Sequence, residues 1–126
     1  MNKRLLVVDE DAALCESLEL LLKSYEWTVR TCRDVGQARK VAADLAPGLV
    51  LCELRLPEAD ILRFCREVRA VEPPVPVVLF MTQGLDAIVV GQAVARTSVD
   101  GFVEKPFEAM ALVRRAESIA AERGEE

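Results

Sequence analysis

The sequence predicts an α/β fold in which helices cover both faces of a parallel β-sheet. Two observations support this fold class. Short apolar runs alternate along the chain with longer segments whose apolar residues recur at helical spacing. The short runs are almost continuously apolar, which is typical of parallel strands buried on both faces. With 126 residues the chain is the size of one domain, so we take residues 1–126 as a single folding unit.

Each strand is expected where an apolar, β-prone run is bounded by polar or turn-forming residues. The first run ends in acidic residues, and the third lies between Pro47-Gly48 and Pro57. The runs place strands near residues 4–8, 27–32, 49–54, 75–80 and 101–104. Sites in open parallel sheets form beyond the carboxyl ends of the strands, so the polar residues that follow these runs are the candidates for function.

Helices are expected between these strands and after the last one. Asp34 and Gln37 have the spacing of an N-cap and N3 pair, and the helix they open runs through Val41 to Leu45. A fourth helix is expected over residues 86–96. The remaining helices show apolar residues on one face: Leu14, Leu18, Leu21, Leu22 and Tyr25 in the first, Ile61, Phe64, Cys65 and Val68 in the third, and Leu112, Val113, Ala116, Ile119 and Ala120 in the last.

Composition excludes several classes of function. The net charge is -5 and the basic residues are scattered, which argues against direct nucleic-acid binding, because phosphate contacts need clustered Lys and Arg. The chain has no histidine, so it has no Ser-His or Cys-His relay, no phosphohistidine and no histidine-ligated metal. The four cysteines form no C-x-x-C pair and lie in apolar segments, which indicates buried free thiols in a reducing compartment. The apolar run before Asp9 is too short for a signal peptide or a membrane span, so we expect a cytoplasmic protein without membrane contact.

Charged residues stand at the ends of three expected strands. Asp9 and Glu10 follow the first strand, Glu53 lies at the end of the third, and Lys105 follows the fifth. Since the carboxyl ends of parallel strands meet at one edge of the sheet, these carboxylates and the ammonium group should lie close together. Such a set suits a divalent cation and a phosphoryl group. The sequence therefore predicts a cation and phosphoryl site at this edge.

Four segments in order along the chain resemble the receiver domain of bacterial two-component response regulators: Leu5–Asp11, Leu49–Pro57, Pro76–Phe80 and Phe102–Phe107. The resemblance implies a single flavodoxin-like (βα)5 domain with strand order 2-1-3-4-5, and a protein that is not an enzyme. In that family a sensor kinase phosphorylates an aspartate at the end of the third strand, and Mg²⁺ is held by an acid pair after the first.

Carried over residue by residue, the resemblance places Asp9 and Glu10 on the acid pair and Glu53 on the phosphoacceptor position. It therefore implies a metal site formed by Asp9, Glu10 and Glu53. The acceptor itself departs from the family, because a glutamate stands where an aspartate is expected. The longer side chain moves the carboxylate outward by about 1.5 Å, and misplacement of that order costs roughly 100-fold in rate.

The resemblance also assigns the residues that contact the phosphoryl group and report the switch. Lys105 matches the lysine of the family motif, Pro106 its cis proline, and Phe102 the aromatic switch residue. Met81 falls on the Ser/Thr position and offers no hydroxyl, because a thioether is only a weak acceptor. Thr82 replaces it only if the loop is shifted by one residue. We therefore expect a module that works without phosphorylation, in one fixed conformation.

The acidic cluster needs a cation to relieve its repulsion. Mg²⁺ is one candidate and Lys105 is the other; a Glu53–Lys105 contact would weaken or exclude Mg²⁺. Simpler interpretations stay open. The acids after the first strand would also favour a helix N-terminus through its dipole, Glu53 could be a solvated loop acid, and Met81 a core residue.

The fourth helix is unusually apolar for a surface helix, since Gln92 is the only polar residue of its interior. We expect an interaction surface formed by some of Ile88, Val89, Val90 and Val94. In the receiver family the fourth helix, fifth strand and fifth helix form the usual dimer or output face. Its polar rim here would be Asp100, Glu104, Arg114 and Arg115. The alternative is a helix that is buried more deeply.

These observations favour a signalling module that contacts a sensor kinase, an output domain or a second copy of itself. Two alternatives remain. One is a phosphorylatable receiver that controls a C-terminal DNA-binding or other output domain. The other is a small flavodoxin-like cofactor-binding protein, which should carry a Gly-, Ser- or Thr-rich phosphate loop where this chain has Asp9-Glu10-Asp11.

Overall fold

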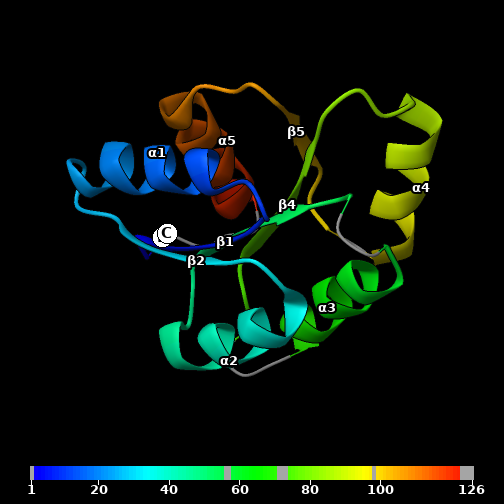
Figure 1. The fold of residues 1–126 in the computed structure, drawn as a ribbon, viewed down its shortest axis with the longest axis horizontal. Helices are drawn as coiled ribbons and strands as arrows, with labels where there is room; N and C mark the ends of the chain where they lie inside the picture. The colour runs from blue at the N-terminus through cyan, green and yellow to red at the C-terminus, as the bar shows by residue number, and fades with distance from the viewer. Residues whose placement is uncertain (1, 56–57, 71–73, 98, 123–126) are drawn as a thin grey trace.

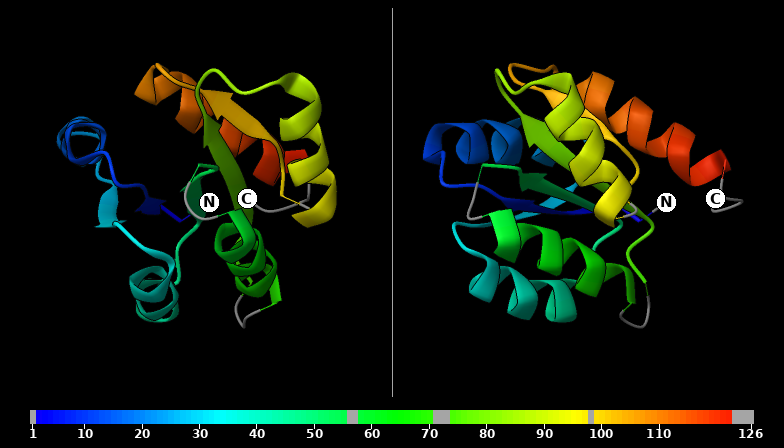
Figure 2. Two further views of the ribbon diagram at one scale, coloured as in Figure 1. Left: turned by 45° about the vertical axis from the view of Figure 1, so that its right-hand side comes forward. Right: turned by 90° about the vertical axis from the view of Figure 1, so that its right-hand side faces the viewer.

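Strands and helices alternate along the chain and form a layered α/β structure (Figures 1 and 2). The computed structural model describes residues 2–55, 58–70, 74–97 and 99–122. The strands are β1 (Arg4–Val8), β2 (Thr28–Cys32), β3 (Leu49–Glu53), β4 (Val77–Thr82) and β5 (Phe102–Glu104). The helices are α1 (Ala12–Lys23), α2 (Val35–Leu45), α3 (Glu58–Ala70), α4 (Ala87–Thr97) and α5 (Ala109–Glu122).

The sheet is parallel throughout and has the strand order β2-β1-β3-β4-β5. This confirms the predicted fold class and strand order. The register places Glu53 of β3 directly opposite Met81 of β4, and Thr82 opposite Glu104 of β5. The ends of these neighbouring strands therefore meet at one edge of the sheet, where the sequence predicts the site.

Two apolar clusters fill the space between the sheet and its helices. The first lies between the sheet and α2, α3 and α4, and the second between the sheet and α1 and α5 (Figure 1). Successive strand residues alternate between them: Leu51 belongs to the α1–α5 cluster and Cys52 to the α2–α4 cluster. The same alternation directs Asp9, after Val8, and Glu53, after Cys52, toward the α1–α5 side. Two carboxylates that are distant in sequence thus share one face.

The fourth strand differs from its expected position. The sequence places it near residues 75–80, whereas β4 is Val77–Thr82. Pro76 lacks an amide hydrogen for the ladder, which favours a later start, and Met81 and Thr82 are still buried and paired. The other strands lie within one residue of their expected ranges.

The start of α1 is fixed by the acidic segment that precedes it. The Asp11 side chain is the N-cap and accepts a hydrogen bond from the amide of Leu14 at 3.1 Å. The predicted N-cap pair of α2 also forms, because Asp34 Oδ1 accepts from the Gln37 amide at 2.8 Å. Asp9 therefore lies in a short turn between β1 and a capped helix, which restricts the direction of its side chain.

All four cysteines are free and buried, as the sequence predicts. Burial, followed by the charge of Asp9, raises the pKa of Cys15 to about 11. Burial and a hydrogen bond with Cys65 raise the pKa of Cys52 well above its ordinary value. Thiolates are the reactive form of cysteine, so these thiols are inert core residues.

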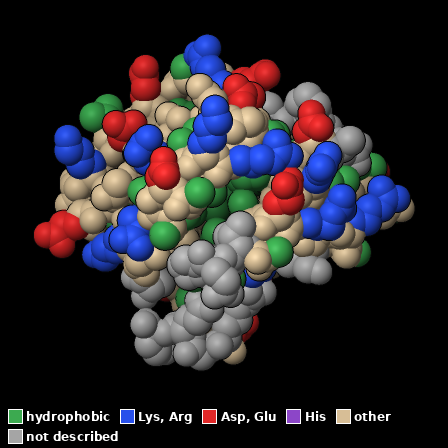
Figure 3. All heavy atoms as spheres, turned by 90° about the horizontal axis from the view of Figure 1, so that it is seen from below, with side chains coloured by type: hydrophobic (Ala, Val, Ile, Leu, Met, Phe, Trp, Pro, Cys, Tyr) green, Lys and Arg blue, Asp and Glu red, His purple; other side chains and the backbone are tan. Residues whose placement is uncertain are grey.

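One face of the molecule carries mixed charge, and no described helix could span a membrane. Lys and Arg side chains are interspersed with Asp and Glu on the face shown in Figure 3. Across the described ranges, each helix is too short or too polar to cross a bilayer.

Candidate functional site

A lysine bridges two carboxylates at the carboxyl edge of the sheet. Asp9 follows β1, Glu53 is the last residue of β3, and Lys105 follows β5. Lys105 Nζ donates to Asp9 Oδ2 and to Glu53 Oε1, at 2.7 Å in each case. We call Asp9, Glu53 and Lys105 the triad. The sequence predicts that these three residues meet, and the structure brings them into direct contact.

The triad is nearly buried, and its carboxylate oxygens all accept hydrogen bonds. The side chains of Asp9, Glu53 and Lys105 are 4%, 11% and 11% exposed. The second oxygen of each carboxylate accepts from a backbone amide: Asp9 Oδ1 from Asp11 at 3.0 Å and Glu53 Oε2 from Arg55 at 3.1 Å. Every carboxylate oxygen of the triad therefore has a donor, so Glu53 is not a solvated loop acid.

The charge state of Lys105 is set by two opposing effects. Burial lowers its pKa, whereas hydrogen bonds to Asp9 and Glu53, and the negative charges of both, raise it. The carboxylates prevail, and the pKa of Lys105 is raised above its ordinary value of 10.5. Lys105 is therefore a cation at neutral pH and neutralises one of the two negative charges beside it.

A cavity of about 340 Å³ opens above the triad and gathers the predicted acidic residues. It is lined by Asp9, Glu10, Asp11, Glu53, Arg55 and Lys105. Glu10 is exposed and lies outside the hydrogen-bonded group. Arg55 is the one lining residue that the sequence argument does not single out. An exposed arginine in a loop carries no pattern that marks it, although Arg55 stands only two residues after Glu53.

The carboxylates are of the type that binds Mg²⁺, but their arrangement is that of an ion-paired site. Among the described residues, no three acidic or cysteine side chains are placed to hold a metal ion. The reason is visible in the triad: the ammonium of Lys105 lies between Asp9 and Glu53, and the remaining oxygens accept from backbone amides. As arranged, these residues do not fit the Mg²⁺ of the family.

Met81 and Thr82 point to opposite sides of the sheet. Met81 lies opposite Glu53 and packs, fully buried, in the α1–α5 cluster on the same side as the triad. It thus lies beside Glu53, at the position to which the resemblance assigns a Ser or Thr hydroxyl. Alternation turns the buried side chain of Thr82 to the other side of the sheet, so Thr82 does not replace that hydroxyl. Its backbone oxygen instead accepts from the amide of Lys105 at 2.7 Å.

The two remaining residues of the predicted site flank Lys105. The Lys105–Pro106 peptide bond is cis. Phe102, at the start of β5, is 38% exposed, and its backbone oxygen accepts from Arg115 Nη1 at 2.6 Å. Phe102 lies with Phe107 and Arg115 in the wall of a second cavity of about 340 Å³ beside α5.

Some of the residues predicted to form an interaction surface are exposed. Ile88 and Val89 are 71% and 47% exposed, and Glu104, Arg114 and Arg115 are also exposed. α4 and α5 flank the edge strand β5 (Figures 1 and 2). We call Ile88 and Val89, the exposed large apolar residues of α4, the apolar face.

Three residues assigned to this surface lie wholly or partly below it. Val90 is buried in the α2–α4 cluster. The sequence does not distinguish it from Ile88 and Val89, because a helix without a polar stripe does not show which of its sides faces the solvent. Val94 is partly buried against the same cluster. Asp100 is not part of a polar rim: its carboxylate pairs with Arg69 Nη2 at 2.6 Å and accepts from the amide of Val78 at 2.9 Å. The ion pair joins α3 to the segment before β5, and the hydrogen bond from Val78 joins that segment to β4.

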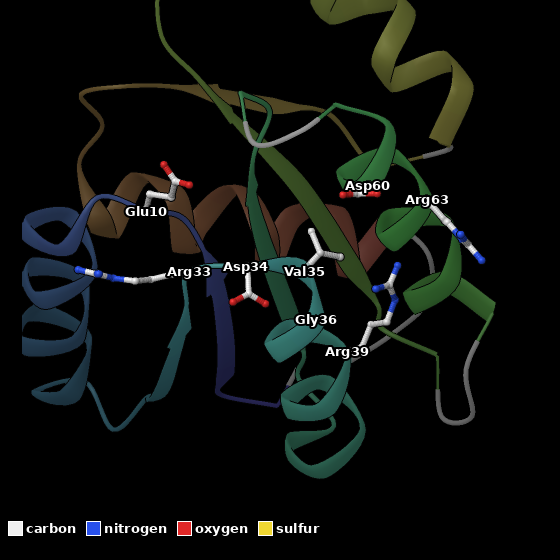
Figure 4. Close-up of a pocket in the computed structure, with 8 residues that line it drawn as sticks. All are labelled: Glu10, Arg33, Asp34, Val35, Gly36, Arg39, Asp60 and Arg63. Atoms are coloured by element: carbon white, nitrogen blue, oxygen red, sulfur yellow. The ribbon is translucent and has the colours of Figure 1, made fainter.

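A third cavity, of about 330 Å³, lies between the beginnings of α2 and α3 (Figure 4). Its charged residues do not converge on one point. Arg33 extends away from Arg39 and Arg63 (Figure 4), and Arg39 is held by Glu67 at 2.9 Å. The cavity also carries Glu10, Asp34 and Asp60. Mixed and divergent charges of this kind do not define a site for an anion or a cation.

Comparison with known proteins identifies the family of this arrangement. A family model described as the response regulator receiver domain matches residues 5–117. The DNA-binding response regulator MtrA of Mycobacterium tuberculosis is 35% identical over 115 residues, which are 91% of this chain and 49% of MtrA. Response regulator MprA of Mycobacterium ulcerans is 28% identical, over 94% of this chain and 50% of MprA. The chain thus spans about half the length of these curated relatives.

Solved structures give the same result at the level of the fold. A putative response regulator from Chloroflexus aurantiacus matches with a TM-score of 0.79 and 28% identity, over 96% of this chain and 99% of that one. The signal receiver domain of a response regulator from Bermanella marisrubri matches with a TM-score of 0.79 and 31% identity, over 94% and 98%.

Proposed function

Since this chain belongs to the response regulator receiver family of two-component signalling, we propose that it is a receiver whose contacts with partners do not depend on phosphorylation. The observation that carries the proposal is the bridge from Lys105 to both Asp9 and Glu53. In this arrangement the acceptor carboxylate is already paired with the lysine that would bind the phosphoryl group. The ion pair takes the place of a phosphorylated aspartate.

Two further features support the proposal. Met81 fills the hydroxyl position with a buried thioether, so a phosphoryl group on Glu53 would lack one of its donors. Lys105 competes with Mg²⁺ for the same carboxylate oxygens, and we propose that Mg²⁺ binds weakly or not at all. Receiver domains and response regulators are generally not enzymes, and we propose no catalytic activity.

The proposed partner is a protein. Receiver domains interact with kinases and output domains, and here the apolar face offers the contact, with Glu104, Arg114 and Arg115 as its polar rim. A second copy of the chain is the occupant we test first, because a self-contact needs no other component. Four buried free thiols fit the reducing cytoplasm as the compartment.

A second candidate is a phosphorylatable receiver that controls an output domain. It is favoured by the relatives, since MtrA is a DNA-binding response regulator of about twice this length. The two candidates differ in whether the triad accepts a phosphoryl group. The cofactor-binding alternative has no such support, because the turn after β1 carries Asp9, Glu10 and Asp11.

Beryllofluoride, a mimic of an acceptor-bound phosphoryl group, distinguishes these candidates. In an amide NMR spectrum with Mg²⁺ present, we expect beryllofluoride to leave the signals of Glu53, Thr82 and Phe102 unshifted, because Lys105 already engages the acceptor. The same titration of Glu53→Asp is the control for the reagent. Shifts in the unmodified protein that extend from Glu53 to Phe102 would refute phosphorylation independence and favour the second candidate.

Substitution in the apolar face tests the contact. We expect the chain to self-associate in sedimentation equilibrium, and Ile88→Asp to weaken the dimer by at least about tenfold, since an exposed apolar side chain contributes roughly 1.5 kcal/mol when buried. Leu20→Asp is the matched control, because Leu20 of α1 is 74% exposed on another helix. A monomer at all concentrations, or an equal effect of both substitutions, would contradict the self-contact.

A further inference from the structure

We infer that Arg55 is a positioning residue that fixes the loop between β4 and α4, and through it the start of α4, without a phosphoryl group. The inference rests on the proposed phosphorylation-independent function, because a fixed α4 is what that function requires. Arg55 is an exposed loop residue, and the fold alone does not require an arginine there.

Arg55 joins the acceptor strand to the β4–α4 loop through both ends of the residue. Its backbone amide donates to Glu53 Oε2 at 3.1 Å. Its guanidinium Nη2 donates to the backbone oxygen of Gln83, the first residue after β4. One residue therefore contacts both the Glu53 carboxylate and the loop between β4 and α4.

The loop passes this restraint on to α4. Gly84 follows Gln83 with a φ of 67°, a left-handed conformation that favours glycine, and a Cβ there would lie 3.5 Å from Arg55 Nη2. Two residues later, Asp86 immediately precedes α4: its side chain accepts from the amide of Ile88 at 2.8 Å and its backbone oxygen from the amide of Val90 at 3.1 Å. Ile88 is the most exposed member of the apolar face.

The position of Arg55 compensates for what Met81 lacks. A hydroxyl beside the acceptor would bind a phosphoryl oxygen and draw the β4 end toward it, but Met81 is packed in the core. The guanidinium, in the wall of the cavity above the triad, instead donates to the backbone oxygen of Gln83, two residues after Met81. A hydrogen bond from a charged donor to a carbonyl is suited to this, because it is stronger than a neutral one.

The test is amide hydrogen exchange on the full chain, without Mg²⁺ or beryllofluoride. Arg55→Met keeps most of the length of the side chain and removes its donors. We expect the amides of Ile88 and Val90, both hydrogen-bonded to Asp86, to exchange about fivefold to tenfold faster, the effect of losing one charge-assisted hydrogen bond at an exposed site. Arg55→Lys, which retains the charge and a single donor group, should restore part of the protection.

Arg66→Met is the matched control, since Arg66 is an exposed arginine of α3. Unchanged exchange at Ile88 and Val90 in Arg55→Met would overturn the inference, and so would equal acceleration in α1, which would indicate general loss of stability. The result is separate from the beryllofluoride titration. If that titration shifts Phe102 while Arg55→Met still frees α4, the proposed function fails and the role of Arg55 stands.

Discussion

Lys105→Met should lower the free energy of unfolding by about 3 kcal/mol, the largest effect we expect from a single substitution outside the apolar core. The substitution leaves Asp9 and Glu53 buried side by side with no positive charge between them. Removing one partner of a buried ion pair costs more than the pair contributes, because the remaining charge is neither solvated nor paired. Here two charges are left, and they also repel each other.

Urea unfolding followed by circular dichroism measures this loss. Lys40→Met is the matched control, because Lys40 is an exposed lysine of α2 and should change stability by less than about 0.5 kcal/mol. Mg²⁺ should restore part of the stability of Lys105→Met and have little effect on the unmodified protein, since the substitution frees oxygens that lysine occupies. A variant as stable as the Lys40 control would show that the triad is not the buried ion pair described here.

The pH dependence of the unmodified protein provides a second test of the same contact. The pKa of Lys105 is raised in the folded state, so its stabilisation is fully present below the ordinary lysine value of 10.5 and is lost as the pH rises through the higher folded value. Lys105→Met should lack this alkaline loss while being less stable at neutral pH.

The fold was predictable because apolar periodicity determines it almost alone. The runs around Leu5–Val8 and Leu49–Cys52 are buried on both faces, and only a parallel sheet with helices on each side satisfies that pattern. The end of β4 was less predictable. Met81 and Thr82 follow the β-branched and aromatic run, and neither residue by itself indicates a strand. Only their pairing with β3 and β5 shows that they belong to β4.

The candidate site also contains some residues that the sequence predicts and others that it does not. Residues at strand ends, such as Asp9, Glu53 and Lys105, have their place fixed by topology and meet as expected. The positions of the Arg55 and Asp100 side chains depend instead on partners that are distant in sequence. Arg55 contacts Gln83, and Asp100 contacts Arg69. No local pattern marks such a partner. The sequence therefore predicts the ionic centre of the site but not the contacts that link it to α4.

The chain of contacts also explains why the departures from the family occur together. With Glu53 held by Lys105, a hydroxyl at position 81 would have no phosphoryl group to bind, and a buried hydroxyl without a partner is unfavourable. Met81 fills that space with apolar volume instead. Arg55 then supplies a restraint on the loop that does not require phosphorylation. The three residues form one arrangement, so the effect of a substitution at position 81 should depend on which residue stands at position 53.

Glu53→Asp should come first, and it should allow phosphorylation. The shorter side chain moves the carboxylate back by about 1.5 Å. This takes it out of its contact with Lys105 and to the position of the aspartate carboxylate in the family. With Mg²⁺ and an acyl phosphate as donor, we expect the phosphorylation rate to exceed that of the unmodified protein by roughly 100-fold. Phosphate-affinity electrophoresis and intact mass measure the product, and Glu53→Gln, which cannot form an acyl phosphate, is the control.

Met81→Thr should then act only in the presence of the first change. Position 81 lies opposite residue 53 on the same side of the sheet. In the double variant, a threonine hydroxyl there can reach a phosphoryl group on the shorter acceptor and raise the phosphorylation rate by about tenfold more, the effect of one added hydrogen bond. In the background of Glu53 the same threonine should bring no phosphorylation and only lower stability, because its hydroxyl replaces apolar volume in the core. If the unmodified protein is phosphorylated as fast as Glu53→Asp, the glutamate is itself a competent acceptor, and the chain is a working receiver whose lysine bridge opens when the donor binds.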